Sequence, residues 1–344
     1  MRLLIYASEF PPGPGGIGEH AYQVARHLAR RGWRICVAAP QHEASEAASR
    51  AFNRRQPFAV RRLPRTVTPL ALRGADHVLA SGQRAVWMAA LSGRPFTAVA
   101  HGREFHLPGL ALTRRAFRRA RSVLAVSDFT RREMRAAGID QPRVHVVRNG
   151  ADAERFFPQQ VERAPGRLLL TVGSVTARKG QAQVVRALTH LPPDVTYHMA
   201  GPPREGERIT ALAHALGVAD RIVLHGAVPR AELPGLGNAC DLFVLASQRT
   251  PDDVEGFGIA VLEAALCRKP AVVTAGSGLE EAVQHGVTGL VVPPGDPAAL
   301  AAAIRDLLAD DERRLSMGEA ARMAARTWDQ VVDEVAAVLA ADMR

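Results

Sequence analysis

The chain has 344 residues, 47% of them hydrophobic and 23% charged, with 29 Gly and 23 Pro. These values exclude a disordered or fibrous protein and are typical of a globular chain of two domains. No run approaches the roughly 20 apolar residues of a membrane-spanning helix, and residues 1–10 are too short and too acidic for a signal peptide. We therefore expect a cytoplasmic protein. The three cysteines, at 36, 240 and 267, lack C-x-x-C spacing, which excludes a disulfide framework or a zinc ribbon.

The positive charge is confined to the first half of the chain. Residues 1–160 hold 26 Arg and no Lys against 11 acidic residues, a net charge of +15. Residues 161–344 hold 18 basic and 23 acidic residues, a net charge of −5. This asymmetry indicates an anionic partner of the first half, such as a membrane surface, a nucleic acid or a phosphorylated acceptor.

Short apolar runs alternate with amphipathic segments along the first half. Residues 17–30 place Ile17, Val24 and Leu28 on one stripe, with Arg26 and Arg30 opposite, which predicts a helix. Runs that are apolar throughout predict strands buried on both faces, at 2–7, 34–39, 77–80, 97–101, 122–127 and 143–147.

The second half repeats this scheme. Its predicted strands are 167–173, 195–201, 221–225, 241–247, 270–274 and 289–292. Alternation at this pitch indicates parallel sheets with helices on both faces. We expect an α/β protein of two Rossmann-like domains that face one another across a cleft.

The predicted domain break lies between residues 157 and 165, where Pro158 and Pro165 interrupt the periodicity. The expected domains are therefore 1–160, for the acceptor, and 161–326, for the donor. The segment 327–344 contains an amphipathic run from Trp328 to Leu339, which predicts a helix that packs back across the domain join. We expect the break and this helix to act as the hinge of domain closure.

A glycine-rich turn follows the first predicted strand. Residues 13–18 satisfy G-x-G-x-x-G, but the second strand ends in Ala38-Ala39-Pro40 without the acidic residue of a dinucleotide site, which argues against an NAD enzyme. Glycines and a helix N-terminus suit an anion such as diphosphate, approached most closely at Gly16. The alternative is a tight turn that binds nothing.

A second glycine-bounded turn, residues 173–180, follows the first strand of the second half. It is not a Walker loop, because Lys179 precedes the closing glycine. Arg178 and Lys179 lie where open α/β sheets bind ligands, and Arg can grip a phosphate bidentately. Lys179 is one of only two lysines in the chain, which indicates that Arg does not replace it. The alternative is a solvated turn.

The most specific pattern is Glu255-Gly256-Phe257-Gly258 followed by Glu263. The glycines allow a backbone turn against a ligand, and a helix is expected from about Gly258. Glu263 can accept two hydrogen bonds from a vicinal diol such as a ribose. A surface carboxylate near the helix start is the alternative, but the residues on either side of Glu263 are apolar.

These motifs together resemble glycosyltransferase family 4. The resemblance adds Asn149-Gly150-Ala151-Asp152 with Phe156, and Gly278-Leu279-Glu280-Glu281, and it runs nearly end to end. It implies a retaining, nucleotide-sugar-dependent enzyme of the two-domain type called GT-B.

The resemblance also implies residue roles. His101, Arg178, Lys179 and Glu255 would be catalytic, with Glu255 on the transferred sugar and the two cations on the leaving phosphates. On the sequence alone a histidine at a strand end, such as His101, is more often structural. Donor binding would fall to Gly16, Ser174, Val228 beside the base, Gly256, Phe257, Gly258, Ile259, Leu262 and Glu263 on the ribose.

Three positions depart from the family pattern. Ser174 stands where the family usually has Arg, and we expect Arg178 to compensate. Arg268 stands where Gly is common, and Glu280 where Pro is common. The first departure leaves open the alternative that the phosphate-binding turn at residues 173–180 has lost its function.

An arginine-rich helix is expected over residues 112–121. Leu112, Ala116, Phe117 and Ala120 would share one face, and the other side would carry Arg114, Arg115, Arg118, Arg119 and Arg121. Each such charge near an anionic leaflet contributes about 1 kcal/mol, so this helix is a candidate peripheral membrane contact at the inner face. The alternative is the solvated side of an ordinary helix.

The expected activity is transfer of a hexose from a UDP-, GDP- or ADP-sugar to a hydroxyl acceptor, in cell-envelope or polysaccharide biosynthesis. The acceptor could be a glycan, a lipid-linked or anionic molecule, or a small molecule. No D-x-D motif occurs, and we expect no metal and no other cofactor. Three alternatives remain: a basic nucleic-acid binder, which would leave the glutamates without a role, an inactive sugar-nucleotide-binding protein, and a sugar-nucleotide epimerase.

Overall fold

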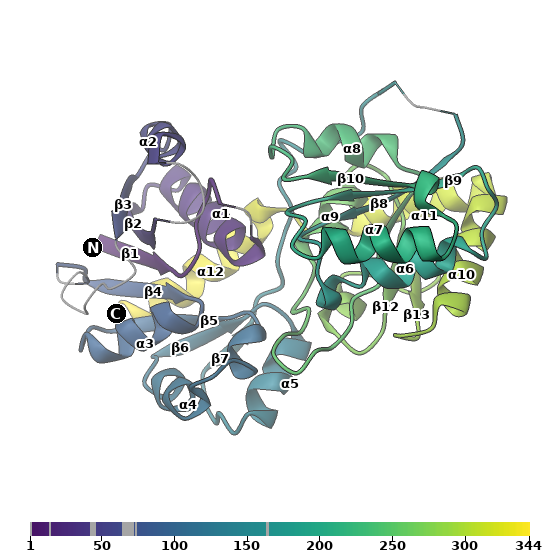
Figure 1. The fold of residues 1–344 in the computed structure, drawn as a ribbon. Helices are drawn as coiled ribbons and strands as arrows, with labels where there is room; N and C mark the ends of the chain where they lie inside the picture. Colours follow the sequence, from purple (N-terminus) through teal and green to yellow (C-terminus); the bar gives the residue numbers. More distant parts are fainter. Residues whose placement is uncertain (1, 14, 42–45, 64–71, 73, 163–164) are drawn as a thin grey trace. The chain divides into compact units, whose positions relative to one another are not determined.

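The computed structural model describes residues 2–13, 15–41, 46–63, 72, 74–162 and 165–344. It divides into two compact units, Met1–Asn149 with Trp328–Arg344 as unit 1 and Gly150–Thr327 as unit 2 (Figure 1). Unit 2 thus begins ahead of the predicted break at 157–165, because the intervening segment packs within unit 2. Ala151 pairs with Thr327, and Asn238 Nδ2 donates to Phe157 O over 3.0 Å. Residues 163–164 of that break lie outside the described residues.

Unit 1 has a seven-stranded sheet in the order β3-β2-β1-β4-β5-β6-β7, and every pairing in it is parallel. Its strands are β1 (Arg2–Ala7), β2 (Arg34–Pro40), β3 (Ala59–Leu63), β4 (His77–Ser81), β5 (Phe96–Ala100), β6 (Ser122–Ala125) and β7 (Val144–Val146). Its helices are α1 (Gly16–Arg30), α2 (Glu46–Arg54), α3 (Gln83–Leu91), α4 (Leu110–Arg118), α5 (Asp128–Ala136) and α12 (Trp328–Asp342).

Unit 2 has a six-stranded parallel sheet in the order β10-β9-β8-β11-β12-β13. Its strands are β8 (Arg167–Val172), β9 (Val195–Ala200), β10 (Ile222–Gly226), β11 (Leu242–Leu245), β12 (Ala271–Thr274) and β13 (Gly289–Val292). Its helices are α6 (Gln181–Leu188), α7 (Gly206–Ala215), α8 (Leu233–Ala239), α9 (Ile259–Leu266), α10 (Pro297–Ala309) and α11 (Asp311–Ala324).

All twelve predicted strands are present, as are the predicted helices that begin near residues 17, 258 and 328. The missed strand is β3, at the edge of the unit 1 sheet. Its sequence carries Arg61 and Arg62, and the Arg62 guanidinium donates to Asn53 Oδ1 over 3.0 Å. An edge strand has a solvated side, so the run of β3 is not continuously apolar and lacks the pattern of a strand buried on both faces.

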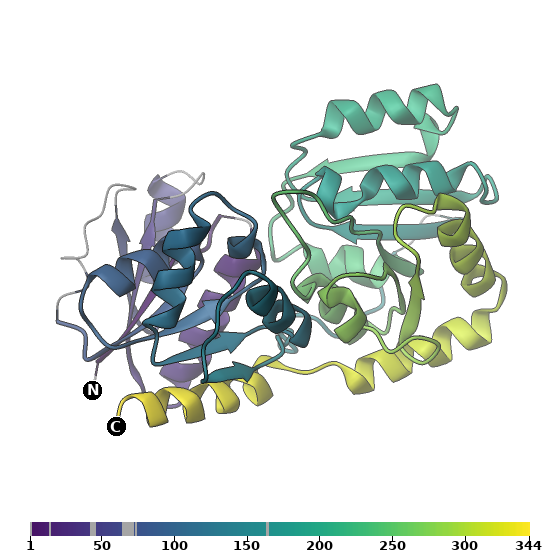
Figure 2. The ribbon, with the colours of Figure 1, turned by 90° about the horizontal axis from the view of Figure 1, so that it is seen from below.

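The C-terminal helix α12 belongs to unit 1 and packs against α1 (Figure 2). Asp329 accepts a hydrogen bond from the His27 ring over 2.8 Å, and Asp333 forms an ion pair of 2.7 Å with Arg31. None of the helices in the described part of the chain is long and apolar enough to cross a bilayer.

Each strand order reverses once between neighbouring strands, between β1 and β4 in unit 1 and between β8 and β11 in unit 2. Open α/β sheets bind ligands at the carboxyl ends of the strands beside such a switch point. The glycine-rich turns of the sequence follow β1 and β8. The fold therefore places both turns at a switch point.

Candidate active site

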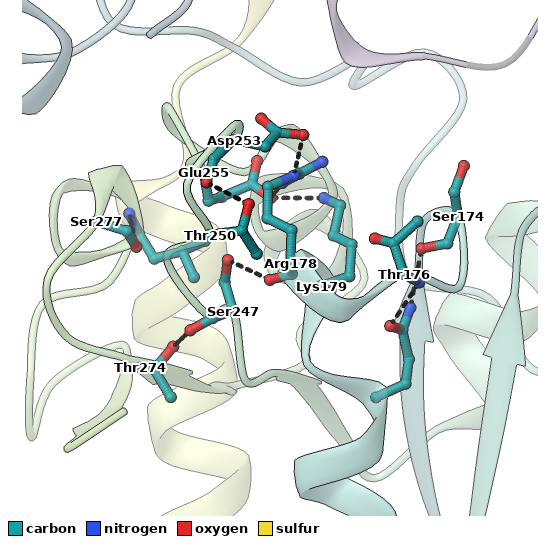
Figure 3. A network of polar contacts seen from close by, with 12 residues as sticks. Ser174, Thr176, Arg178, Lys179, Ser247, Thr250, Asp253, Glu255, Thr274 and Ser277 are labelled. Atoms are coloured by element: carbon teal, nitrogen blue, oxygen red, sulfur yellow. Dashed lines mark hydrogen bonds and ion pairs between the residues drawn. The ribbon is translucent and has the colours of Figure 1, made fainter. Parts of the chain in front are cut away.

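A cationic turn, Ala177–Lys179, follows β8 (Figure 3). A loop that carries the carboxylates Asp253 and Glu255 follows β11. Arg178 Nε lies 2.8 Å from Asp253 Oδ2, and its guanidinium also donates to Glu255 Oε2. Lys179 Nζ lies 2.7 Å from the same oxygen of Glu255. Three residues predicted to be catalytic are thus in direct contact at the switch point of unit 2.

The end of β11 holds this turn in place. Arg178 O accepts hydrogen bonds from Ser247 Oγ over 2.9 Å and from Gln248 N over 2.7 Å. Gly180 has a φ of 72°, and a Cβ there would overlap the carbonyl oxygen of Ala246. Only glycine fits such a position, so the close approach of the two loops depends on it.

The electrostatics of this cluster are those of an ion-pair network. Burial alone would raise the pKa of Glu255, but Arg178 and Lys179 outweigh it and lower that pKa to about 2. Burial opposes the charge of Arg178 as well, yet Glu255 and Asp253 raise its pKa above the ordinary value. Burial lowers the pKa of Lys179 despite the attraction of Glu255. The cluster therefore keeps a carboxylate ionised between two cations.

The loop from Glu255 to Gly258 is pressed against the turn that contains Gly278. Gly278 N donates to Glu255 O over 2.9 Å, and a Cβ on Gly278 would overlap the carbonyl of Gly256. Gly258 has a φ of 88° and precedes Ile259, the first residue of α9, so the N–H groups at the start of α9 lie beside this loop. Phe257 of this loop and Leu262 of α9 are buried.

Glu263 is a buried carboxylate on the apolar helix α9, and it is 5% exposed. A buried charge requires a partner. Its Oε1 forms an ion pair of 2.6 Å with Arg230 Nη2. Arg230 follows β10, two residues after Val228, which is half-buried. The plain-surface alternative for Glu263 is therefore wrong.

Sequence reasoning missed Arg230 and Asp253. Asp253 lies two residues before Glu255 in the run Asp252-Asp253-Val254-Glu255, so its alternation with Glu255 was a visible signal. Arg230 is separated from Glu263 by 33 residues, and a pairing at that distance has no local pattern.

The family departures have local explanations. Ser174 lies three residues before the cationic turn, and its carbonyl accepts from Gln181 Nε2 over 3.1 Å. Arg178, within the turn, donates to Glu255. Arg268 has a φ of 60°, a left-handed conformation that favours glycine. Glu280 Oε1 accepts from Gly276 N over 3.2 Å and so holds the turn before it.

His101 and Gly16 lie in unit 1. The backbone N–H of His101 donates to Glu104 Oε1 over 2.7 Å, and its Nε2 lies 2.9 Å from Ser81 Oγ. Burial and the neighbouring His20 lower the pKa of His101 well below 6.5, so the imidazole is neutral at pH 7. Gly16 begins α1, and a Cβ there would meet no atom of the described chain within 4 Å. Pro14 of the same glycine-rich run lies outside the described residues.

The arginines of the predicted basic helix differ in their contacts. Arg114 Nε donates to Ala137 O over 2.5 Å, Arg118 Nη2 donates to Gly138 O over 2.8 Å, and Arg121 donates to Asp342 O. Arg115, on α4, and Arg119, directly after its last residue, are exposed. The prediction that Leu112 shares the buried face is wrong, because this side chain is 40% exposed, whereas Ala116 and Phe117 are buried. α4 ends at Arg118, so its last predicted turn is not helical.

Among the described residues, no group of three or more His, Cys, Asp or Glu side chains is arranged to hold a metal ion. The three cysteines are free thiols, and two of them, Cys240 and Cys267, are buried.

Both halves of the chain match known families. Residues 152–324 match the family of glycosyl transferases group 1, and residues 14–155 match Glycosyltransferase Family 4. The chain is 30% identical, over 365 residues, to the GDP-mannose-dependent alpha-(1-6)-phosphatidylinositol monomannoside mannosyltransferase of Mycolicibacterium smegmatis, with 93% of this chain and 92% of that protein covered. It is 35% identical, over 217 residues, to the D-inositol 3-phosphate glycosyltransferase of Xylanimonas cellulosilytica, with 57% of this chain and 51% of that protein covered.

Solved structures share the fold along the whole chain. Anabaena HepE in complex with UDP-glucose superposes with a TM-score of 0.85 at 21% identity and covers 99% of this chain and 100% of that one. WaaG, a glycosyltransferase involved in lipopolysaccharide biosynthesis, has a TM-score of 0.75 at 18% identity and covers 98% of this chain and 99% of that one. The predicted class of two Rossmann-like domains of the GT-B type is confirmed. The chain belongs to glycosyltransferase family 4, and it is a glycosyltransferase.

Proposed function

We propose that the protein transfers a hexose from a nucleoside-diphosphate sugar to a hydroxyl acceptor, with retention at the anomeric carbon, in cell-envelope or polysaccharide biosynthesis. The observation that carries this proposal is the meeting of Arg178, Lys179 and Glu255 at the switch point of unit 2. Fixed cations beside a helix N-terminus suit a leaving diphosphate. A relative named for GDP-mannose and the HepE complex with UDP-glucose support this class of donor.

Different residues contact the hydroxyl groups and the charged diphosphate of the donor. Glu263 uses Oε1 for Arg230, and a carboxylate has a second oxygen with which to accept from the ribose diol. Glu255 takes hydroxyls of the hexose, and the backbone from Gly256 to Ile259 takes the diphosphate. Val228 lines the base pocket.

Catalysis is mainly electrostatic. The bond between the anomeric carbon and the diphosphate oxygen breaks, and a bond from that carbon to the acceptor oxygen forms on the same face. The acceptor proton moves to the departing diphosphate. Arg178, Lys179 and the N–H groups at the start of α9 stabilise the growing negative charge, so no metal ion is required. We assign no protein nucleophile.

The acceptor side belongs to unit 1. A cavity of about 270 Å³ lies at the carboxyl ends of β1 and β4, and its lining includes Glu9, Arg84, Arg103 and Glu104. This volume suits one sugar-sized group, and side chains of both signs suit a polyol that carries an anionic group. The relatives named for inositol phosphates support such an acceptor. His101, held by Glu104, would contact its reacting end.

Helix α4 supplies the membrane contact for a lipid-linked acceptor. The exposed Arg115 and Arg119 follow the exposed Leu112 by three and seven residues, a spacing that suits contact of one face with an anionic leaflet at the inner face of the membrane. Flotation with vesicles of phosphatidylglycerol and phosphatidylcholine tests this. The wild-type protein should float with anionic vesicles, and the variant Arg115→Glu/Arg119→Glu should not. Equal flotation of both, or none, contradicts the contact.

A release assay tests the proposed transfer. GDP-mannose, UDP-glucose and ADP-glucose are offered with D-inositol 3-phosphate and with lipid extracts as acceptors, in EDTA, and free nucleoside diphosphate is measured. Release that depends on acceptor supports transfer. Thermal stabilisation by nucleotides without release would favour an inactive binding protein, and epimerised sugar nucleotide would favour an epimerase.

A further inference from the structure

Three buried rings are stacked edge to face inside unit 1. The His20 ring lies 5.2 Å from the His101 ring at an interplanar angle of 87°, and 5.5 Å from the Trp328 ring at 79°. Trp328 is 1% exposed and His20 is 2% exposed. The rings come from three elements: Trp328 begins α12, His20 lies in α1, and His101 follows β5.

Packing rather than hydrogen bonding joins the rings. His20 Nδ1 and Trp328 Nε1 are buried and have no hydrogen-bond partner in the described part of the chain. Burial lowers the pKa of His20 to about 4, so this ring is neutral at pH 7. Ser81 Oγ holds Nε2 of His101, whereas His20 contacts Trp328 and His101 through ring packing, so a change in the size of one ring displaces the next.

Helix α12 is fixed to unit 1 at both ends. Near its start, Asp329 binds His27 of α1, and Asp333 binds Arg31, the residue directly after α1. Near its end, the buried Asp342 accepts from Thr97 Oγ1 over 2.6 Å and from Ser122 Oγ over 2.8 Å. Thr97 lies on β5, the strand that ends directly before His101. Both ends of the helix are therefore tied to elements that carry or neighbour His101.

We propose that Trp328 and His20 are positioning residues for His101. Trp328 presses on His20, which in turn fixes the edge of the His101 imidazole, while Ser81 holds its Nε2. Trp328 is also the first residue after the chain passes from unit 2 back to unit 1. The orientation of His101 thus depends on how the crossing segment enters unit 1. This inference rests on the proposed role of His101.

Histidine ring spectra of the full chain test the positioning directly. In ¹⁵N-histidine protein, Trp328→Leu and His20→Leu should each move the His101 ring signals, assigned with His101→Gln. The matched control is Trp33→Leu, which removes a half-buried indole that lies beyond the other end of α1. That control should leave the His101 signals in place. Unmoved His101 signals in both test variants overturn the proposal.

Kinetics give the second readout. A displaced catalytic group costs about 10- to 100-fold in turnover, so both variants should lose that much kcat with the KM for sugar nucleotide unchanged. If Trp328→Leu fails to fold, Trp328→Phe and His20→Phe replace the pair, with smaller losses in the same direction. Moved signals with kcat equal to that of Trp33→Leu also overturn the proposal. A wild-type protein without transfer activity would instead contradict the proposed function. The ring spectra do not depend on activity, so they still test the positioning of His101 in that case.

Discussion

Glu255 in unit 2 and Glu104 in unit 1 are both poorly exposed carboxylates at a switch point, but their pKa values move in opposite directions. Arg178 and Lys179 overcome burial and lower the pKa of Glu255 to about 2. Burial raises the pKa of Glu104 to about 7, although the backbone N–H of His101 opposes it. Glu255 is thus kept charged by paired cations, whereas burial favours the neutral form of Glu104.

This difference follows the chemistry proposed for each half. A departing diphosphate develops negative charge, so fixed cations stabilise it as it forms. An acceptor hydroxyl is neutral. His101 is also neutral and Glu104 is already desolvated, so neither side chain has to lose a hydration shell when the acceptor binds. The contrast makes each half sensitive to a different kind of substitution.

Removal of a cation should have the largest effect. Lys179→Ala should lower kcat by about 10²- to 10³-fold, because one donor to the departing charge is lost. Nucleoside diphosphate release measures this, with Lys269→Ala as the control that removes the other lysine. Loss of activity to the same extent in both variants would show that the effect is not specific to the cationic turn.

Low pH should reduce the free energy of unfolding, because Glu255 becomes protonated. Its pKa is depressed in the folded state, so the stability it contributes is present above the unfolded value of 4.5 and is lost as the pH falls from 4.5 to about 2. The amount is at most about 3 kcal/mol. Urea unfolding between pH 5 and pH 2.5 checks this. Glu255→Gln should flatten that part of the profile, and an unchanged slope would contradict the ion-pair account.

Glu104 should give the opposite slope. Its raised pKa means that the folded state binds the proton more tightly, so stability falls as the pH rises from 4.5 to about 7 and then levels off. The loss is at most about 3 kcal/mol, and Glu104→Gln should remove it. The same unfolding series checks this. If wild type and Glu104→Gln show the same pH dependence of unfolding over this range, the predicted contrast between Glu104 and Glu255 is wrong.

Glu263→Ala should have a smaller effect and act on binding alone. The loss of hydrogen bonds to a ribose costs about 1.5 to 3 kcal/mol for a charged acceptor, so the Kd for nucleoside diphosphate should rise by about tenfold or more, with little change in kcat. Titration calorimetry measures it. The control is Glu319→Ala, which removes a half-exposed carboxylate paired with Arg268. Equal affinities of Glu263→Ala and wild type would contradict the ribose assignment.

The features that could be predicted from the sequence are those encoded by local patterns. Buried strands, glycine turns and the segment from Glu255 to Glu263 are each encoded in consecutive residues, and the second glycine turn contacts Glu255 in unit 2. The ion pair between Arg230 and Glu263 and the contact between His20 and Trp328 join residues far apart along the chain. Such pairings follow from the packing of whole elements, so no short pattern marks them. The prediction for Leu112 is wrong, because its side chain is 40% exposed while Ala116 and Phe117 of the same helix are buried.

Nucleotide titration in EDTA tests the central claim most directly. Wild type, Glu263→Ala and Lys179→Ala are each titrated with GDP, UDP and ADP and with the corresponding nucleosides. The account predicts that wild type binds at least one of them without metal, that Glu263→Ala binds it about tenfold more weakly, and that Lys179→Ala loses affinity for the diphosphate relative to the nucleoside. Identical binding by all three proteins, or no binding by the wild type, would contradict a donor site built from the carboxylates and the cationic turn.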